Sequence, residues 1–192
     1  MQGRGPEPCE RTVTMGVTQH STHSILYLDY DGVLHPADVR VRRTRGIYVH
    51  SPAGSQLFEH ADLLEELLAP YPQVSVVLST SWVRVRGFTH ARNRLPAGLR
   101  RRVIGATYHR RHMREWEFTA MPRGMQVWQD VVRRKPSRWL ALDDDGVDWP
   151  IWCLAHFVTT HETRGISDPS TQGILRQALT RNCWRSPRTD PA

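Results

Sequence analysis

Short, continuous runs of apolar residues recur along the chain, and each run is bounded by polar or turn-forming residues. A strand that is buried on both faces shows such an unbroken run, whereas a half-exposed strand alternates between apolar and polar residues. Many residues in these runs are β-branched, which favours strands. We therefore expect five buried strands, at residues 25–28, 74–78, 102–106, 139–142 and 156–159.

Between these runs, apolar residues recur at helical spacing in three segments: 56–69, 123–134 and the stretch after Asp168. Asp168 is a favourable N-cap, and Pro169 is tolerated at the first position of a helix. Residues 88–95 predict a less regular, arginine-rich helix. The side chains expected on the three buried faces are Leu57, Ala61, Leu64 and Leu68, then Met125, Trp128, Val131 and Val132, and finally Ile174, Leu175, Ala178 and Leu179.

This alternation of strands and helices predicts an α/β fold in which helices cover both faces of a parallel, doubly wound sheet, giving a three-layer sandwich. Two internal segments lack a clear pattern. Residues 35–54 form a polar, basic stretch with a possible extended piece at 46–50, and residues 107–122 are basic and aromatic but match neither periodicity.

The two ends of the chain are not patterned like the middle. Residues 1–22 are rich in Gly, Pro, Ser, Thr and charge, and predict a disordered lead-in within which Met15 is an alternative start. Residues 182–192 predict a flexible tail. We therefore expect one domain over residues 23–181.

Composition narrows the class of protein. Of the 192 residues, 39% are hydrophobic and 23% are charged, which is ordinary for a globular domain. No window approaches the 18 apolar residues of a membrane span, and the N-terminus lacks a signal peptide's apolar core. The three cysteines are widely spaced, which argues against a disulfide framework or a thiolate zinc site. We expect a cytoplasmic protein.

The charge is biased towards arginine. Lys and Arg total 26 against 19 Asp and Glu. Such a balance favours polyanionic partners, but a solvated basic surface is an equally good interpretation. Trp116 lies among Arg110, Arg111 and Arg114, an interleaving that suits single-stranded nucleic acid. The tryptophans expected in the core instead are Trp82, Trp128, Trp139 and Trp152.

Polar side chains of the kinds used in catalysis and metal binding follow three of the expected strands. Because parallel strands end on one side of a sheet, these groups are expected to converge at one edge. Arg123, at the start of its helix, is expected to reach the same edge. The groups are Asp29 and Asp31 after the first strand, Ser79, Thr80 and Ser81 after the second along the chain, and Asp143 and Asp144 after the fourth.

Clustered carboxylates repel one another, so they indicate a cation, and hard oxygen ligands suit Mg²⁺. A carboxylate nucleophile, a second carboxyl group, a divalent ion and anion-binding groups are the components of phosphoryl transfer through an aspartyl-phosphate. Taken singly, each signal has a simpler interpretation: an acidic turn, a hydroxyl that caps a helix, or a surface arginine.

These residues resemble the haloacid dehalogenase (HAD) superfamily of phosphohydrolases, in the order and context of its four motifs. Arg123 matches the third motif, where lysine is usual and arginine is not a simple replacement. More narrowly, the chain resembles the small HAD domains of bacterial RNA-repair ("Swiss Army Knife") proteins over about residues 24–180. The matching stretches are DYDGVLHP at 29–36, LSTSW at 78–82, VIGAT at 103–107 and WLALDDD at 139–145.

The resemblance implies a role for each matching residue. Asp29 would be the nucleophile and a metal ligand, and Asp31 the general acid/base and a ligand through its backbone carbonyl. Thr80 would hold the phosphoryl group, with Ser81 and then Ser79 as alternatives, and Arg123 would offset its charge. The residues expected to complete the Mg²⁺ site are Asp143 and Asp144.

The expected function is a magnesium-dependent phosphohydrolase that acts through an aspartyl-phosphate intermediate. The space between the first two motifs is too short for a large cap domain, and open sites in this superfamily tend to accept polymeric phosphates. With the basic charge, this favours a phosphate at the end of a nucleic acid or a nucleotide. A catalytically weak nucleic-acid-binding or regulatory module is the alternative, and a phosphotransferase or mutase is a third possibility.

Overall fold

A five-stranded parallel sheet forms the centre of the molecule, and the order of its strands is β5-β4-β1-β6-β7. The computed structural model describes residues 24–44, 46–51 and 54–181. All five predicted strands are present, with small shifts at their ends. They are β1 (Ser24–Leu28), β4 (Val74–Leu78), β5 (Val103–Ala106), β6 (Arg138–Asp143) and β7 (Phe157–Thr159).

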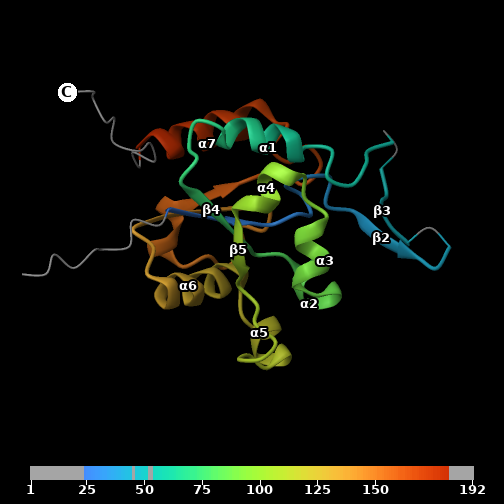
Figure 1. Cartoon of the computed structure of the whole chain (residues 1–192), viewed down its shortest axis with the longest axis horizontal. Helices are drawn as coiled ribbons and strands as arrows, with labels where there is room; N and C mark the ends of the chain where they lie inside the picture. Colours follow the sequence, from blue (N-terminus) through green and yellow to red (C-terminus); the bar gives the residue numbers. More distant parts are fainter. Residues whose placement is uncertain (1–23, 45, 52–53, 182–192) are drawn as a thin grey trace, which may run out of the picture.

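Strand β1 occupies the middle of the sheet, and both of its faces are covered. Leu26 and Leu28 pack into the hydrophobic core that includes side chains of α1 (Ala61–Leu68) and α7 (Pro169–Arg181). Ile25 and Tyr27 lie in a second cluster, with side chains of α6 (Arg123–Arg134). Figure 1 shows α1 and α7 on one face of the sheet and α6 on the other. The predicted three-layer α/β sandwich is confirmed.

The predicted helices are present, although their ends and buried faces differ in part. Helix α6 has the predicted bounds, but α1 begins only at Ala61, after a turn in which Phe58 adopts a positive φ of 64°. At the start of α7, the N–H of Thr171 donates to Oδ2 of Asp168 at 3.1 Å, as expected of an N-cap. The prediction that Val132 and Ile174 lie on buried helix faces is wrong, since both side chains are exposed.

Several short elements complete the fold, and of these only the arginine-rich helix at residues 88–95 was predicted; it is present as α3 and ends two residues earlier. Three six-residue helices follow β4, and Gly87, with φ +89°, separates the first from the second. The first and third of these helices carry too many arginines to show an apolar stripe. A fourth lies in the unassigned segment 107–122, and a 3₁₀ helix precedes β7. The elements are α2 (Ser81–Arg86), α3 (Phe88–Asn93), α4 (Ala97–Arg102), α5 (Glu115–Ala120) and η1 (Ile151–His156).

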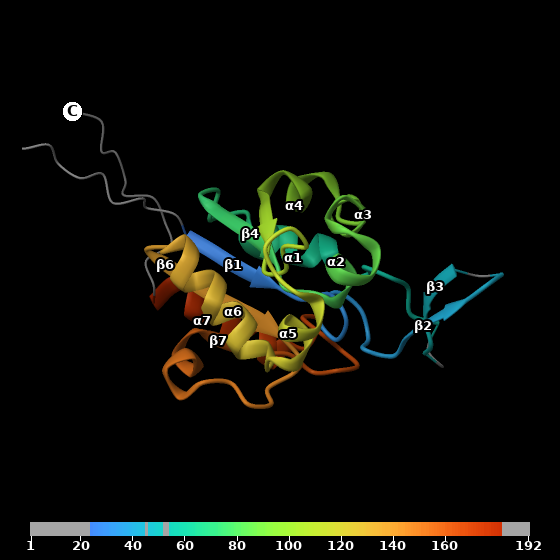
Figure 2. The same cartoon turned by 90° about the horizontal axis from the view of Figure 1, so that it is seen from below.

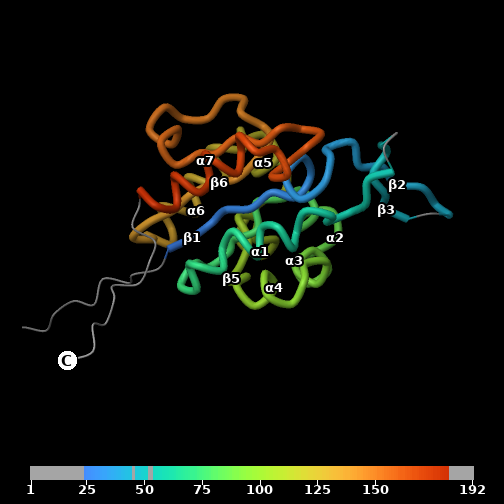
Figure 3. Tube along the Cα trace, turned by 90° about the horizontal axis from the view of Figure 1, so that it is seen from above, coloured from blue at the N-terminus to red at the C-terminus, as the bar shows by residue number. Residues whose placement is uncertain are grey.

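Residues 35–54 contain an antiparallel hairpin of β2 (Val39–Arg42) and β3 (Gly46–Val49), of which only the second strand was expected. The hairpin projects from the body of the molecule in Figures 2 and 3. It is the only strand pairing between β1 and α1 in the described residues, so the domain is nearly capless, as predicted. Helices α2 and α5 lie beyond the carboxyl end of β1 (Figure 2).

The tryptophan predictions hold in part. Trp82 and Trp139 are buried, Trp128 is partly buried, and Trp152, which contacts Trp128, is 60% exposed rather than in the core. Among the helices in the described ranges, none is long and apolar enough to cross a membrane. The predicted lead-in and tail lie outside the described residues, and the domain boundaries at 23 and 181 stay predictions.

Candidate active site

Asp29 is the first residue after β1, and neighbouring strands hold its backbone in place. Its N–H donates to the carbonyl of Leu142 at 3.0 Å, while the N–H of Ser79 donates to the carbonyl of Leu28 at 2.8 Å. These bonds extend the sheet ladder past the ends of the strands. Asp29 is only 4% exposed, and its Oδ1 accepts a 2.7 Å hydrogen bond from the N–H of Tyr30.

Arg123 links three strand ends with one guanidinium. Nη2 lies 3.3 Å from Oδ2 of Asp29, and Nε lies 3.3 Å from Oδ2 of Asp143. Nη1 donates to the backbone carbonyl of Ser79 at 2.9 Å. Burial alone lowers the pKa of Arg123, but the surrounding carboxylates raise it above its ordinary value. The guanidinium therefore stays charged between the two acids.

Three carboxyl groups form a compact cluster. One oxygen from each of Asp29, Asp143 and Asp144 lies within 4.8 Å of the others. Burial raises the pKa of Asp29 and of Asp143, and in Asp143 the neighbouring Asp29 raises it further, whereas Arg123 lowers both values. Burial, and then Asp29, raise the pKa of Asp144 to about 6.

Such a cluster suits a divalent cation with a preference for hard oxygen ligands. Two of the three carboxyl groups are almost fully buried, and one guanidinium does not neutralise three carboxylates. Burial first, and then neighbouring carboxylates, raise these pKa values, and a bound cation would oppose both effects. The donors are all carboxylate oxygens, which fits Mg²⁺ rather than a soft metal.

Gly32 brings the turn after β1 against this cluster. Its φ is +69°, a conformation that side chains rarely adopt, and a Cβ at this position would overlap the carboxylate of Asp144. The carbonyl of Gly32 accepts a 2.6 Å hydrogen bond from the hydroxyl of Thr160. The glycine is therefore required both by the turn and by the approach of Asp144.

The hydroxyl groups after β4 occupy different environments. Thr80 is the N-cap of α2 and its Oγ1 accepts from the N–H of Trp82 at 3.4 Å. Thr80 also hydrogen-bonds Asp29, which lowers that residue's pKa. The Ser79 hydroxyl is buried and has no partner among the described residues, whereas Ser81 is partly exposed. Of the three, Thr80 and Ser81 line the cavity described below.

Asp31 is placed apart from the three-acid cluster, and its carboxylate is held by two donors. Nε2 of His35 lies 3.0 Å from Oδ1, and Nε1 of Trp82 donates to the same oxygen at 2.9 Å. The N–H of Phe58 donates to Nδ1 of His35 at 3.3 Å. Because a backbone N–H only donates, Nδ1 of His35 is the acceptor and Nε2 carries the proton.

Both donors therefore bind Oδ1 of Asp31, and Oδ2 accepts neither of these two hydrogen bonds. His35 is fully buried, and its ring packs edge-on against Phe58 and Trp82. This packing fixes the orientation of the imidazole. A proton carried by Asp31 would sit on Oδ2, because Oδ1 already accepts two hydrogen bonds.

A cavity of about 310 Å³ opens beside these groups, lined by Thr80 and Arg123 on one side. Its other wall comes from residues 118–122, at the end of α5. The amide Nε2 of Gln126 donates to the carbonyls of Phe118 and Met121 at 3.0 Å each, so this wall is tied to α6. The segment without a sequence assignment thus borders the candidate site.

The predicted convergence at one sheet edge is present in the structure. Asp29, Asp143 and Asp144 come together, Arg123 bridges the first two, and Thr80 contacts Asp29. Sequence reasoning missed His35 and the contact between Trp82 and Asp31. His35 follows Asp31 by four residues within the same motif, which was the available signal for His35. Nothing in the sequence signals the Trp82 contact.

One family of known sequences matches most of the chain. It is described as "HAD domain in Swiss Army Knife RNA repair proteins", and the match covers residues 25–171. This range contains every residue of the candidate site and all the strands of the sheet except Ser24, the first residue of β1. Neither a curated protein nor a solved structure matches the chain significantly.

Proposed function

The chain belongs to the family of HAD domains in Swiss Army Knife RNA repair proteins, and from this premise we propose that it is a magnesium-dependent phosphohydrolase that forms an aspartyl-phosphate on Asp29. Membership of the family suggests phosphohydrolase activity. The observation that carries the finer proposal is the separation of the two acids that follow β1, Asp29 and Asp31. Asp29 lies in the buried cluster with Arg123, while Asp31 is bound by His35 and Trp82.

In the proposed first step, a carboxylate oxygen of Asp29 attacks phosphorus, and the bond from phosphorus to the leaving oxygen breaks. Asp31 gives its proton to that oxygen, which leaves as an alcohol. Two strong donors on Oδ1 of Asp31 support this role, because they hold the carboxyl group in one orientation. The products are the alcohol, the acyl phosphate and an ionised Asp31.

In the second step, Asp31 removes a proton from water, and the water oxygen attacks phosphorus. The bond to Asp29 breaks, so inorganic phosphate leaves and both side chains return to their starting states. We assign Thr80 and Arg123 to the oxygens of the transferring group, since both line the cavity beside Asp29. Charge-assisted donors of this kind stabilise the negative charge of the transition state.

The proposed Mg²⁺ ligands are Asp29, Asp143 and Asp144 through their carboxylates and Asp31 through its backbone carbonyl. Bound there, Mg²⁺ would offset the charge of the acids and of the phosphoryl group. The raised pKa values of the three clustered acids support a cation at this position. Arg123 supplies part of that compensation from the protein itself.

The proposed substrate is a phosphate at the end of an RNA strand or another nucleic acid. The family's occurrence in RNA repair proteins supports this class, as does the excess of 26 basic over 19 acidic residues. The domain carries no large cap in its described part, so a polymer end has access to the site.

The experiment that tests the proposal measures phosphate release from 4-nitrophenyl phosphate and from end-phosphorylated oligonucleotides, with Mg²⁺ or with EDTA. We expect release that requires Mg²⁺ and is abolished in Asp29→Asn. Activity that survives this substitution would refute the role of Asp29. If no substrate is hydrolysed but oligonucleotides bind tightly and salt-sensitively, the chain is instead a nucleic-acid-binding module.

A further inference from the structure

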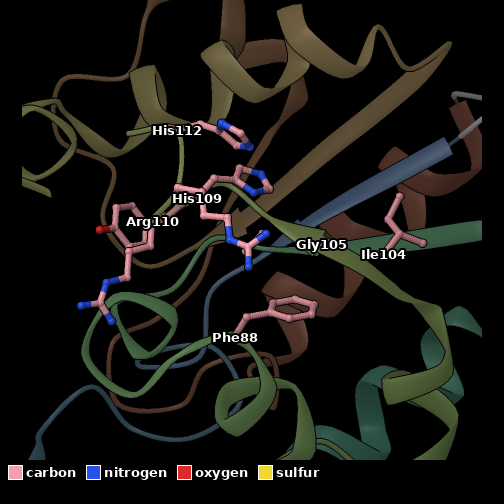
Figure 4. Close-up of a pocket in the computed structure, with 9 residues that line it drawn as sticks. Phe88, Ile104, Gly105, His109, Arg110 and His112 are labelled. Atoms are coloured by element: carbon pink, nitrogen blue, oxygen red, sulfur yellow. The ribbon is translucent and has the colours of Figure 1, made fainter. Parts of the chain in front are cut away.

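A pocket of about 390 Å³ lies at the β5 edge of the sheet, outside the candidate active site. This volume is within the range of small-ligand sites. Figure 4 shows Gly105 and Ile104 on the strand, His109 and His112 on one side and Phe88, from the start of α3, on the opposite side. The complete lining is Phe88, Ile104, Gly105, Ala106, Tyr108, His109, Arg110, Arg111 and His112.

The pocket combines exposed apolar surface with unpaired positive charge. Phe88 is 38% exposed and Ile104 is 49% exposed, although both are large hydrophobic residues. Arg110 and Arg111 are exposed and make no ion pair with a described residue, and no carboxylate is among the lining residues. Arg84, by contrast, is paired with Glu115 at 3.0 Å.

His109 adds a neutral donor to the lining. Nη2 of Arg133 lies 2.7 Å from Nε2 of His109, and because a guanidinium only donates, Nε2 is the acceptor and Nδ1 carries the proton. Burial, and then Arg133, lower the pKa of His109, so the ring is uncharged at neutral pH. An aromatic ring, two free guanidinium groups and a neutral N–H donor suit a base with flanking phosphates.

The pocket lies close to the candidate active site along the sheet edge. The N–H of Thr107 donates to the carbonyl of Leu78 at 2.9 Å, and the hydroxyl groups of the site begin at the next residue, Ser79. Strand β5 is two strands from β1, so the pocket begins roughly 10 Å from Asp29, given about 4.8 Å between strands. This distance is suitable for a neighbouring nucleotide of the same strand.

We propose that this pocket binds the base of a single-stranded nucleotide next to the phosphorylated end, with Phe88 stacking on the base and Arg110 and Arg111 contacting the flanking phosphates. The proposal rests on the proposed function and specifies which part of the polymer is recognised. A base must be unpaired to enter, because stacking on a side chain requires a free face. The pocket therefore selects single strands over duplex ends and over mononucleotides.

The test compares Phe88→Ala and the Arg110→Ala/Arg111→Ala double variant with the unmodified chain. The readouts are kcat/KM for a short end-phosphorylated RNA, kcat/KM for 4-nitrophenyl phosphate, and RNA affinity by fluorescence anisotropy. We expect Phe88→Ala to lower RNA kcat/KM by about 5-fold or more, the scale of one stacked base. Hydrolysis of 4-nitrophenyl phosphate should be unchanged.

An RNA that is abasic next to its phosphorylated end tests the base itself. With the unmodified chain, kcat/KM for this abasic RNA should be reduced by the same factor as kcat/KM of Phe88→Ala for intact RNA. When Phe88→Ala is given the abasic RNA, the two reductions should not add. The double arginine variant should lower the salt dependence of binding by about 0.7 in slope for each lost phosphate contact. Double-stranded RNA and a polyanion without bases serve as competitors, and both should compete weakly.

Arg138→Ala/Arg176→Ala is the matched control, because both arginines are exposed and Arg138 begins β6, which lies three strands away from β5 in the sheet. It removes the same charge and should leave RNA affinity unchanged. The proposal is overturned if abasic and intact RNA behave alike, or if the control weakens binding as much as the pocket variants. Failure of the proposed function appears differently, as no phosphate release from any substrate, while the binding assay still tests the pocket.

Discussion

Nε2 of His35 lies 3.0 Å from Oδ1 of Asp31, and the proton on that nitrogen is fixed by the N–H of Phe58 on the other side of the ring. Trp82 donates to the same carboxylate oxygen at 2.9 Å. The two donors form a rigid support for one carboxyl group at the end of β1. Their proposed purpose is to present Oδ2 of Asp31 to the leaving group.

This support predicts an effect that depends on the leaving group. Trp82→Phe keeps most of the packing but loses the N–H donor, so Asp31 should protonate a poor leaving group less well. We expect kcat/KM for an alkyl phosphate to fall about 10-fold or more, part of the usual contribution of general acid catalysis. 4-Nitrophenyl phosphate, whose leaving group needs little protonation, should be affected much less.

His35→Gln is the companion variant, because its amide retains a donor near the position of Nε2. It should keep more alkyl phosphatase activity than His35→Ala. The control is Trp139→Phe, because Trp139 is a buried tryptophan on the α6 face of the sheet. It should leave kcat/KM unchanged for both substrates. Equal losses on both substrates in Trp82→Phe would mean that the tryptophan serves only to pack the fold.

The close approach of Gly32 to Asp144 predicts that the turn after β1 is coupled to the proposed metal site. Gly32→Ala strains a backbone at φ +69° and drives a Cβ into the carboxylate of Asp144. Gly46→Ala strains a similar backbone, at φ +70°, but its Cβ meets nothing within 4 Å. Both should lose about 1–2 kcal/mol of unfolding free energy from the conformation alone.

The two glycine variants should differ in their response to Mg²⁺. Thermal unfolding with and without the ion should show that Gly46→Ala is stabilised as the unmodified chain is, whereas Gly32→Ala is stabilised little. Identical Mg²⁺ responses would remove Asp144 from the proposed ligand set.

Asp144 predicts how stability depends on pH in the absence of divalent ions. Its pKa is about 6 in the folded chain against 3.8 for an unperturbed carboxyl group, so the folded state holds the proton more tightly. This stabilisation is fully present below about pH 4 and is lost as the pH rises through 6. Because Asp144 is only partly buried, we expect a screened effect of about 1–2 kcal/mol.

Urea unfolding in EDTA should reveal this effect as a comparison of two chains. Asp144→Asn should become progressively more stable than the unmodified chain between pH 4 and 7. Mg²⁺ should stabilise the unmodified chain more at pH 7 than at pH 5, because ligands must lose their protons to bind it. A stability difference that is constant over this pH range would contradict a raised pKa.

The sheet and the acidic cluster were predictable for a simple physical reason. A strand covered on both faces must be apolar throughout, so the runs around Leu26, Val76 and Leu140 identify strands without further information. Parallel strands end at one edge, which is sufficient to bring Asp29 and Asp143 together. The bounds of α6 were also predicted from its apolar periodicity.

The remaining features depend on packing between distant segments. Helices α2 and α4 have six residues each and are rich in arginine, so no apolar periodicity indicates them. The contact of Trp82 with Asp31 joins residues 51 positions apart and depends on how α2 sits on the turn after β1. A tryptophan expected only in the core thus also serves as a hydrogen-bond donor at the site.

The central claim is that Asp29 accepts the phosphoryl group, and a trapping experiment tests it most directly. In Asp31→Asn, 4-nitrophenol leaves without an acid, but the acyl phosphate lacks the base that activates water. We therefore expect a burst of nitrophenol close to one equivalent per chain. Mass spectrometry of the quenched protein should place one hydroxylamine-sensitive phosphoryl group on the peptide that contains Asp29. A chain that turns over the substrate with no phosphoryl group on this peptide, or with one on another residue, would contradict the account.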